Sequence, residues 1–85
     1  MSINPTYFGL LAEFGESEIP LDRICEKYFG LSSAKAKRRA CLQQLPVPAY
    51  RAGLQKSPWL ISAVDLANNI DEQRTIAKRQ WANMK

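Results

Sequence analysis

The sequence predicts one small domain that is mainly α-helical and carries a small β-hairpin. Two observations predict the helices: apolar residues recur at intervals of three and four, and residues typical of helix starts and stops flank these stretches. A third observation predicts the hairpin, because two short runs rich in aromatic and β-branched residues flank a loop that contains glycine. A chain of 85 residues has a small core, so we expect a partner chain to add stability.

The first two helices are delimited by their boundary residues. Asn4 and Pro5 offer an N-cap and a proline at the first helical position, and Gly15 ends the first helix. Its apolar residues are Tyr7, Phe8, Leu11 and Phe14. After a short acidic link, Pro20 opens a second helix that ends at Gly30. The apolar residues of this second helix follow the i, i+3, i+4, i+7 pattern and are Leu21, Ile24, Cys25 and Tyr28.

A third helix is predicted from Ala34 to about Gln44. Ser32 and Ser33 supply N-cap oxygens, and the Leu-Pro-Val-Pro run at 45–48 ends the helix. Two helices joined by a short turn with a glycine are typical of a helix-turn-helix, whose second helix enters the major groove of DNA. Long basic side chains project from this third helix, whereas its narrow apolar face consists of Ala36, Ala40 and Leu45.

The hairpin is predicted to form a wing beside the helix-turn-helix. Its expected strands are Tyr50-Arg51 and Trp59–Ile61, and residues 52–57 form the loop between them. We expect Tyr50 and Trp59 to pack in the core beneath the wing, because a small domain depends on aromatic burial. The predicted fold is therefore a winged helix-turn-helix with an extended C-terminal helix.

The C-terminal helix starts after the wing, where Ser62 and Asp65 resemble a capping box. We expect residues 1–71 to form the winged helix-turn-helix domain and residues 72–85 to form a helical extension. Apolar residues continue along this extension beyond what a compact head could cover, so we expect it to mediate homo-oligomerisation. The alternative is an exposed, fraying terminus. The residues expected to make the contact between protomers are Ile76, Trp81 and Met84.

Basic charge is concentrated in the middle of the chain. No acidic residue lies between Glu26 and Asp65, although the net charge of the whole chain is only +4. A surface of this kind repels itself unless a polyanion neutralises it, and nucleic acid is the first candidate. The alternative is a solvated helix face, but such faces normally carry glutamates at i±4 and this one has none. The seven cations in this stretch are Lys27, Lys35, Lys37, Arg38, Arg39, Arg51 and Lys56.

The candidate DNA-binding residues differ in expected role. Arg38 and Arg39 are expected to contact bases, since a guanidinium can bridge O6 and N7 of guanine. Lys37 is expected to contact phosphate or only to aid solubility, and the serines cap the third helix and offer a phosphate site at its N-terminus. The wing residues either reach the DNA backbone and minor groove or form a plain polar hairpin. The full set is Ser32, Ser33, Lys35, Lys37, Arg38 and Arg39 around the third helix, and Arg51, Gln55 and Lys56 on the wing.

Composition argues against several other classes of protein. The chain has no histidine, its acidic residues lie mostly apart and its glycines do not cluster, so we expect no catalytic residue, metal or cofactor. Cys25 and Cys41 lack CxxC spacing and are expected to be reduced and half-buried. No apolar run is long enough for a membrane span, and the N-terminus lacks the features of a secretory signal. We therefore expect a cytoplasmic protein.

Three segments carry a resemblance to a known family. They are IPLDRICEKYF at 19–29, LPVPAYR at 45–51 and QKSPWLI at 55–61. Together they resemble the PrtN-type pyocin activator family, and the resemblance covers about Ile19 to Asp71. The order of the predicted elements is also similar to the excisionase-type winged helix-turn-helix of phages and prophages.

The resemblance implies a sequence-specific regulator that binds double-stranded DNA and activates prophage or pyocin-like genes. This agrees with the prediction from the residues, in which the third helix lies in the major groove and the wing lies on the flanking backbone, and RNA polymerase is a further candidate partner. Two alternatives stay open. One is a phage excisionase that bends attachment-site DNA, since one fold serves both tasks. The other is a phage-encoded protein-interaction module whose cations meet an acidic host protein.

Overall fold

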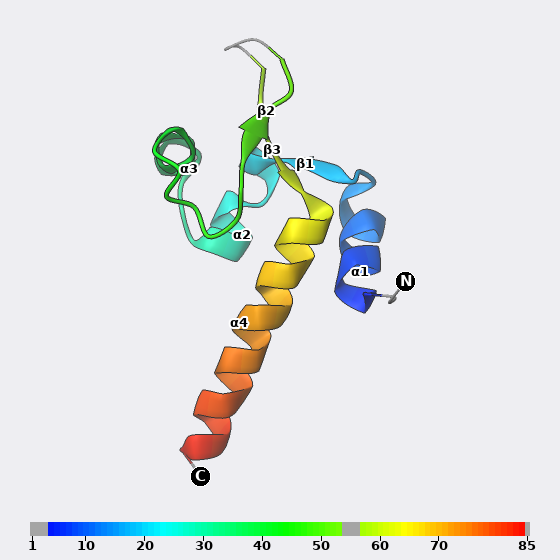
Figure 1. The fold of residues 1–85 in the computed structure, drawn as a ribbon, viewed down its shortest axis with the longest axis vertical. Helices are drawn as coiled ribbons and strands as arrows, with labels where there is room; N and C mark the ends of the chain where they lie inside the picture. The colour runs from blue at the N-terminus through cyan, green and yellow to red at the C-terminus, as the bar shows by residue number, and fades with distance from the viewer. Residues whose placement is uncertain (1–3, 54–56, 85) are drawn as a thin grey trace.

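The structure is a computed structural model that describes residues 4–53 and 57–84. Its helices and strands are α1 (Pro5–Phe14), β1 (Glu18–Pro20), the 3₁₀-helix η1 (Leu21–Arg23), α2 (Cys25–Phe29), α3 (Ser33–Cys41), β2 (Tyr50–Arg51), β3 (Trp59–Ser62) and α4 (Ala63–Asn83). Figure 1 shows the shorter elements gathered as a head around one end of α4, whose other end extends away. The predicted fold class is confirmed: the protein is mainly helical, with a helix-turn-helix, a wing and a long C-terminal helix.

The sheet has three antiparallel strands in the order β1-β3-β2. The predicted wing strands pair as a hairpin, with Tyr50 opposite Leu60. The third strand corrects the sequence analysis, which placed only a link before Pro20. In β1, Ile19 is fully buried and lies opposite Ile61 of β3. A strand of three residues is too short to show an alternating pattern, so its pairing became evident only in the folded chain.

The predicted second helix is divided into two parts. Pro20 ends β1 instead of opening a helix, Leu21–Arg23 form η1, and Ile24 (φ −124°) separates η1 from α2. Leu21 and Ile24 are nevertheless buried, as the apolar pattern predicted. A 3₁₀-helix also brings residues i and i+3 to one side, so apolar spacing alone does not distinguish it from an α-helix. Gly30 ends α2 in a left-handed conformation, as expected.

Helix α3 is shorter than predicted, because it ends at Cys41 rather than near Gln44. The amide of Gln44 donates to the carbonyl of Arg39 at 2.8 Å, and that of Gln43 donates to Ala40 at 3.1 Å. This pair of bonds is a Schellman motif, in which Gln43 takes the left-handed position (φ 55°) that glycine usually occupies. Without a glycine there, the sequence offered no signal for the stop.

The core lies between α4, the sheet and the helix-turn-helix. Its largest fully buried side chains are Ile19, Leu21, Ile24, Ile61, Leu66 and Cys25. Helix α1 covers one side of α4, and the Thr6 hydroxyl donates to the Asp71 carboxylate at 2.5 Å. Trp59 packs against the core as predicted. The burial predicted for Tyr50 is wrong, since it is 40% exposed, and Cys41 is exposed rather than half-buried.

Helix α4 begins where the sequence placed it. The Ser62 hydroxyl caps it by accepting a hydrogen bond from the amide of Val64 at 3.2 Å. From Ala63 to Asn83 the helix is continuous, so it passes through the predicted domain boundary after Asp71, and the division into two domains stays a prediction. Among the residues that the structure describes, no helix is both long and apolar enough to cross a membrane.

Candidate nucleic-acid interface

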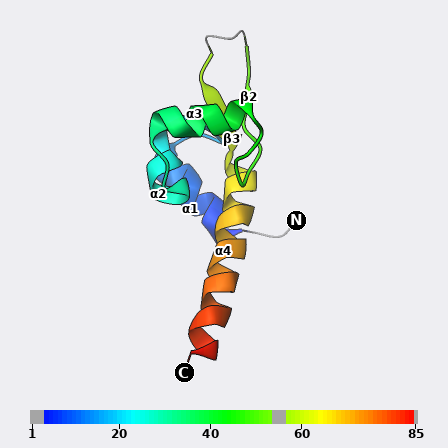
Figure 2. The same cartoon turned by 90° about the vertical axis from the view of Figure 1, so that its left-hand side faces the viewer.

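Helix α3 presents a basic outer face. Ala36 and Ala40 are buried and let the helix pack closely on the head. Successive residues are about 100° apart around an α-helix, so Lys35, Arg38 and Leu42 lie on the side opposite these alanines. All three are exposed. Figure 2 shows α3 lying across the head with the hairpin beside it, so the outer face and the wing lie on adjoining parts of the surface.

The two remaining cations of α3 lie on opposite flanks of the helix. Arg39 is exposed. Lys37, on the other flank, places its Nζ 3.7 Å from Oδ2 of Asp22, an ion pair in which both side chains are about half exposed. Within residues 4–53 and 57–84, no ion pair involves Lys35, Arg38 or Arg39. The positive charge of α3 that is left without a protein partner among the described residues therefore lies on the outer face and on the Arg39 flank.

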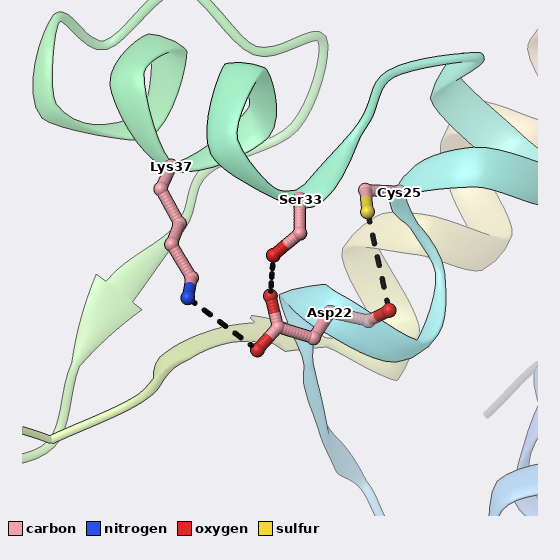
Figure 3. A network of polar contacts seen from close by, with 4 residues as sticks. All are labelled: Asp22, Cys25, Ser33 and Lys37. Atoms are coloured by element: carbon pink, nitrogen blue, oxygen red, sulfur yellow. Dashed lines mark hydrogen bonds and ion pairs between the residues drawn. The ribbon is translucent and has the colours of Figure 1, made fainter.

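Asp22 joins the two halves of the helix-turn-helix (Figure 3). Besides the Lys37 ion pair, its Oδ1 accepts a hydrogen bond from the Ser33 hydroxyl at 2.6 Å, and its backbone carbonyl accepts a weak one from Cys25 Sγ at 3.9 Å. Asp22 belongs to η1, whereas Cys25 belongs to α2 and both Ser33 and Lys37 belong to α3. One carboxylate thus holds α3 against η1. The sequence analysis missed Asp22 because it examined only partners within the same helix.

The two serines at the start of α3 have different roles. The Ser32 hydroxyl is the N-cap and accepts a hydrogen bond from the Lys35 amide at 3.3 Å. Ser33 is the first residue of the helix, and its hydroxyl proton is donated to Asp22. An anionic group therefore already lies near the positive end of the helix dipole, where the sequence predicted a phosphate. Phosphate binding by the two serines stays a prediction.

At the base of the wing, Arg51 stacks on Trp59. The two residues face each other across β2 and β3, and the guanidinium carbon lies 4.4 Å from the centre of the indole ring. Arg51 Nε and Trp59 Nε1 are buried and have no hydrogen-bond partner among the described residues, so stacking is the contact that orients this arginine. Gln55 and Lys56, the other predicted wing contacts, lie outside the residues that the structure describes.

Other cations of the head are paired with acidic residues near α1. Arg23 lies 3.9 Å from a carboxylate oxygen of Glu16, and Lys27 lies 3.2 Å from Oε1 of Glu13. The hydrogen bond to Glu13 raises the pKa of Lys27 above its ordinary value. Lys27 belonged to the basic stretch of the sequence, but in the folded chain its charge is balanced locally. Among the described residues of the head, the cations without an ion-pair partner therefore lie on α3 and β2, while Arg74, Lys78 and Arg79 of α4 lie beyond this face.

Leu42 is a candidate contact that the sequence analysis did not assign. It caps the C-terminal end of α3 and is 58% exposed, next to Arg38 on the outer face. Exposed leucines are common, but one that lies among unpaired cations on the second helix of a helix-turn-helix can contact a thymine methyl group. The sequence did contain a signal for this contact, because Leu42 follows Arg38 by four positions and therefore lies on the same face of the helix.

Fold and surface together define a small winged helix-turn-helix protein with a basic face on its second helix. A family model described as pyocin activator protein PrtN matches residues 6–77. The chain therefore belongs to the pyocin activator protein PrtN family, and the match includes the whole segment over which the resemblance was seen. This is a family of regulators of pyocin genes and not of enzymes. Searches of curated proteins and of solved structures found no match to the chain.

Proposed function

We propose that this protein binds specific sites on double-stranded DNA and activates prophage or pyocin genes from there. The observation that carries the proposal is the set of exposed cations on α3, of which Lys35, Arg38 and Arg39 have no ion-pair partner among the described residues. This set lies on the helix that, in helix-turn-helix proteins, enters the major groove. Family membership supports a regulatory role for such binding.

The geometry supports different contacts to DNA for different residues of the basic face. Arg38 lies opposite the buried face of α3, so it is the residue best placed to reach the edge of a guanine. Lys35 and Arg39 beside it are suited to phosphates along the groove. Arg51, oriented by Trp59, is suited to the backbone next to the major groove. In this arrangement Leu42 adds an apolar contact to a thymine methyl group, which would contribute to sequence preference.

Capture of genomic DNA tests the proposal. Purified protein is mixed at near-physiological salt with sheared DNA of the host, prophage included, and the bound fragments are sequenced. We expect enrichment upstream of late phage or bacteriocin operons. Enrichment at an attachment site or beside an integrase gene would instead identify an excisionase. If no fragment is enriched, specific DNA binding is wrong, and a protein-interaction module with an acidic host partner takes its place.

The salt dependence of binding tests the basic face. If about six phosphates are neutralised, log affinity should fall with log salt concentration at a slope near −5, because each phosphate contact contributes about 0.9. The measurement is fluorescence anisotropy with an enriched fragment across a series of salt concentrations. A slope shallower than about −2 would contradict a phosphate-binding face of this size.

Asp22→Asn tests whether the Asp22 carboxylate restrains binding. The amide keeps an oxygen that accepts from Ser33, so α3 stays in place, while the attraction on Lys37 and one negative charge near the interface are lost. We expect tighter binding to all DNA sequences alike and a salt slope steeper by about 0.9. The free energy of unfolding should change by less than about 1 kcal/mol, because the ion pair is half exposed.

A matched control for this variant is Glu13→Gln. It also removes a carboxylate that pairs with a lysine, in this case Lys27 at 3.2 Å, but on the α1 side of the head. The proposed interface predicts little change in DNA affinity for Glu13→Gln. Equal effects of the two variants would mean that only net charge matters, which would contradict the special position of Asp22.

A further inference from the structure

The core-facing stripe of α4 continues beyond the head. Within the head this stripe is buried, with Leu66 fully covered and Ile70 packed against the core. At about 100° per residue, Ala77, Trp81 and Met84 fall within about 40° of the direction of Ile70. Yet Trp81 is 74% and Met84 88% exposed. The same face that is buried in the core is therefore uncovered along the last three turns of the helix.

The protein has more surface than a compact chain of its size, and the uncovered part of α4 is one source of it. Its accessible surface is 6341 Å², whereas a folded monomer of 9.6 kDa exposes about 5,100 Å². Its radius of gyration is 14.1 Å, against about 12 Å for a compact domain of this length. The excess surface of about 1,200 Å² is shared between the uncovered part of α4 and other exposed segments, and it is of the same order as the ~800 Å² that each partner buries in a standard interface.

A shallow apolar groove runs beside the stripe. Its volume is about 430 Å³, and the residues that line it are Arg74, Ala77, Lys78, Trp81 and Ala82. The two alanines leave room for a neighbouring helix to approach closely. Because the groove and the protruding Trp81 ring belong to one short segment, a second copy of this chain offers both an occupant and an identical groove. Such self-complementarity is what a two-fold interface requires.

The head decides how a second copy is oriented. It covers the stripe down to Ile70, so a partner helix running parallel would place its own head against this one on the same face (Figure 1). An antiparallel partner centred near Ala77 and Lys78 avoids that collision. In this register Trp81 lies beside Arg74 of the other copy, where a cation–π contact is favourable, and Met84 covers the other copy's Ile70. In a parallel pair, Arg74 would instead lie near Arg74 of the other copy, and the two positive charges would repel each other.

We propose that this protein forms a two-fold dimer in which the C-terminal segments of α4, residues 71–84, pair antiparallel through Ala77, Trp81 and Met84. Ile76, which the sequence analysis grouped with these residues, lies about 120° away from Ile70 around the helix and is outside the interface. The proposal does not depend on DNA binding. If the protein also binds DNA, the two heads lie at opposite ends of the paired helices, and the bound sites are inverted repeats.

The mass of the full chain in solution tests the dimer. Light scattering after size-exclusion chromatography should give twice the chain mass of 9.6 kDa for the wild type, and half of that value for Trp81→Glu. Thr75→Glu, which adds the same charge on another side of the helix, should stay dimeric. Circular dichroism confirms that each variant is folded. A monomeric wild type, or a Trp81→Glu variant that stays dimeric, would overturn the proposal.

Disulfide cross-linking tests the orientation. Cys41 is exposed, so the variants carry Cys41→Ser to remove its thiol, whereas Cys25 is buried. Ala77→Cys lies near the proposed two-fold axis and should form a disulfide between protomers under mild oxidation. Met84→Cys should not, because in the antiparallel pair the two sites are about 20 Å apart along the axis, far beyond disulfide reach. Cross-linking of both variants would show a parallel pair and overturn the antiparallel arrangement.

Discussion

Replacing Leu66 with alanine is expected to lower the free energy of unfolding by about 2–5 kcal/mol. Leu66 is fully buried on α4, where the sheet, the helix-turn-helix and α1 meet around this helix. A domain of 85 residues has a total stability of roughly 4–13 kcal/mol, so the loss is a large fraction of the total. The measurement is urea unfolding followed by circular dichroism at a fixed protein concentration, because dimerisation would add its own contribution.

Val64→Ala is the matched control for this prediction. Val64 lies two residues earlier on the same helix but is 49% exposed, so its truncation removes side-chain atoms that are already largely in water. We expect its effect to stay within about 0.5 kcal/mol. If the two variants were equally stable, the face of α4 that packs on the head would have been assigned incorrectly.

Arg38→Ala is expected to weaken specific DNA binding by about 1–3 kcal/mol and to relax the preference at one base pair. The physical reason is position: Arg38 points away from the buried alanines of α3, and no carboxylate among the described residues competes for its guanidinium. Anisotropy measurements on a series of fragments with single base changes give both the affinity and the preference. The lost preference separates base contact from a general loss of positive charge.

Two variants with the same change of charge complete this experiment. Lys27→Ala removes a cation that is already paired with Glu13, so its DNA affinity should stay close to that of the wild type. Lys56→Ala, which removes a wing contact predicted from the sequence, should weaken binding to all sequences alike, as expected for a phosphate contact. If Arg38→Ala and Lys56→Ala showed the same pattern across the fragment series, the division between base contacts and phosphate contacts would be wrong.

Much of the fold was predictable because its signals are local. A cap acts on amides within the next three residues, and a glycine stop requires only the conformation of that residue. Asn4, Ser32 and Ser62 therefore marked three helix starts correctly, and Gly15 and Gly30 marked two helix ends. The same reasoning failed where a local rule was broken, as at Gln43, which takes the conformation usually left to glycine.

The residue types of the candidate site were predictable, but the partners that its basic side chains contact were not. The basic residues of α3 and their separation from Ala36 and Ala40 follow from helical periodicity. Their partners do not, because the ion pair between Lys37 and Asp22 joins elements that meet only after folding. The stacking of Arg51 on Trp59 likewise depends on the register of β2 and β3, which strands of two and four residues do not encode in their own pattern.

By itself, the sequence determined the starts of α1, α3 and α4, the ends of α1 and α2, the order of helix-turn-helix and wing, the basic character of α3, and the family. Only the tertiary structure decided that β1 joins the sheet, that η1 precedes α2, which cations keep their charge unpaired, and how far the head covers α4. The physical reason is how far apart in the sequence the interacting residues lie. Capping and periodicity act over a few neighbouring residues, whereas strand pairing, ion pairing and burial depend on contacts between segments far apart in the chain.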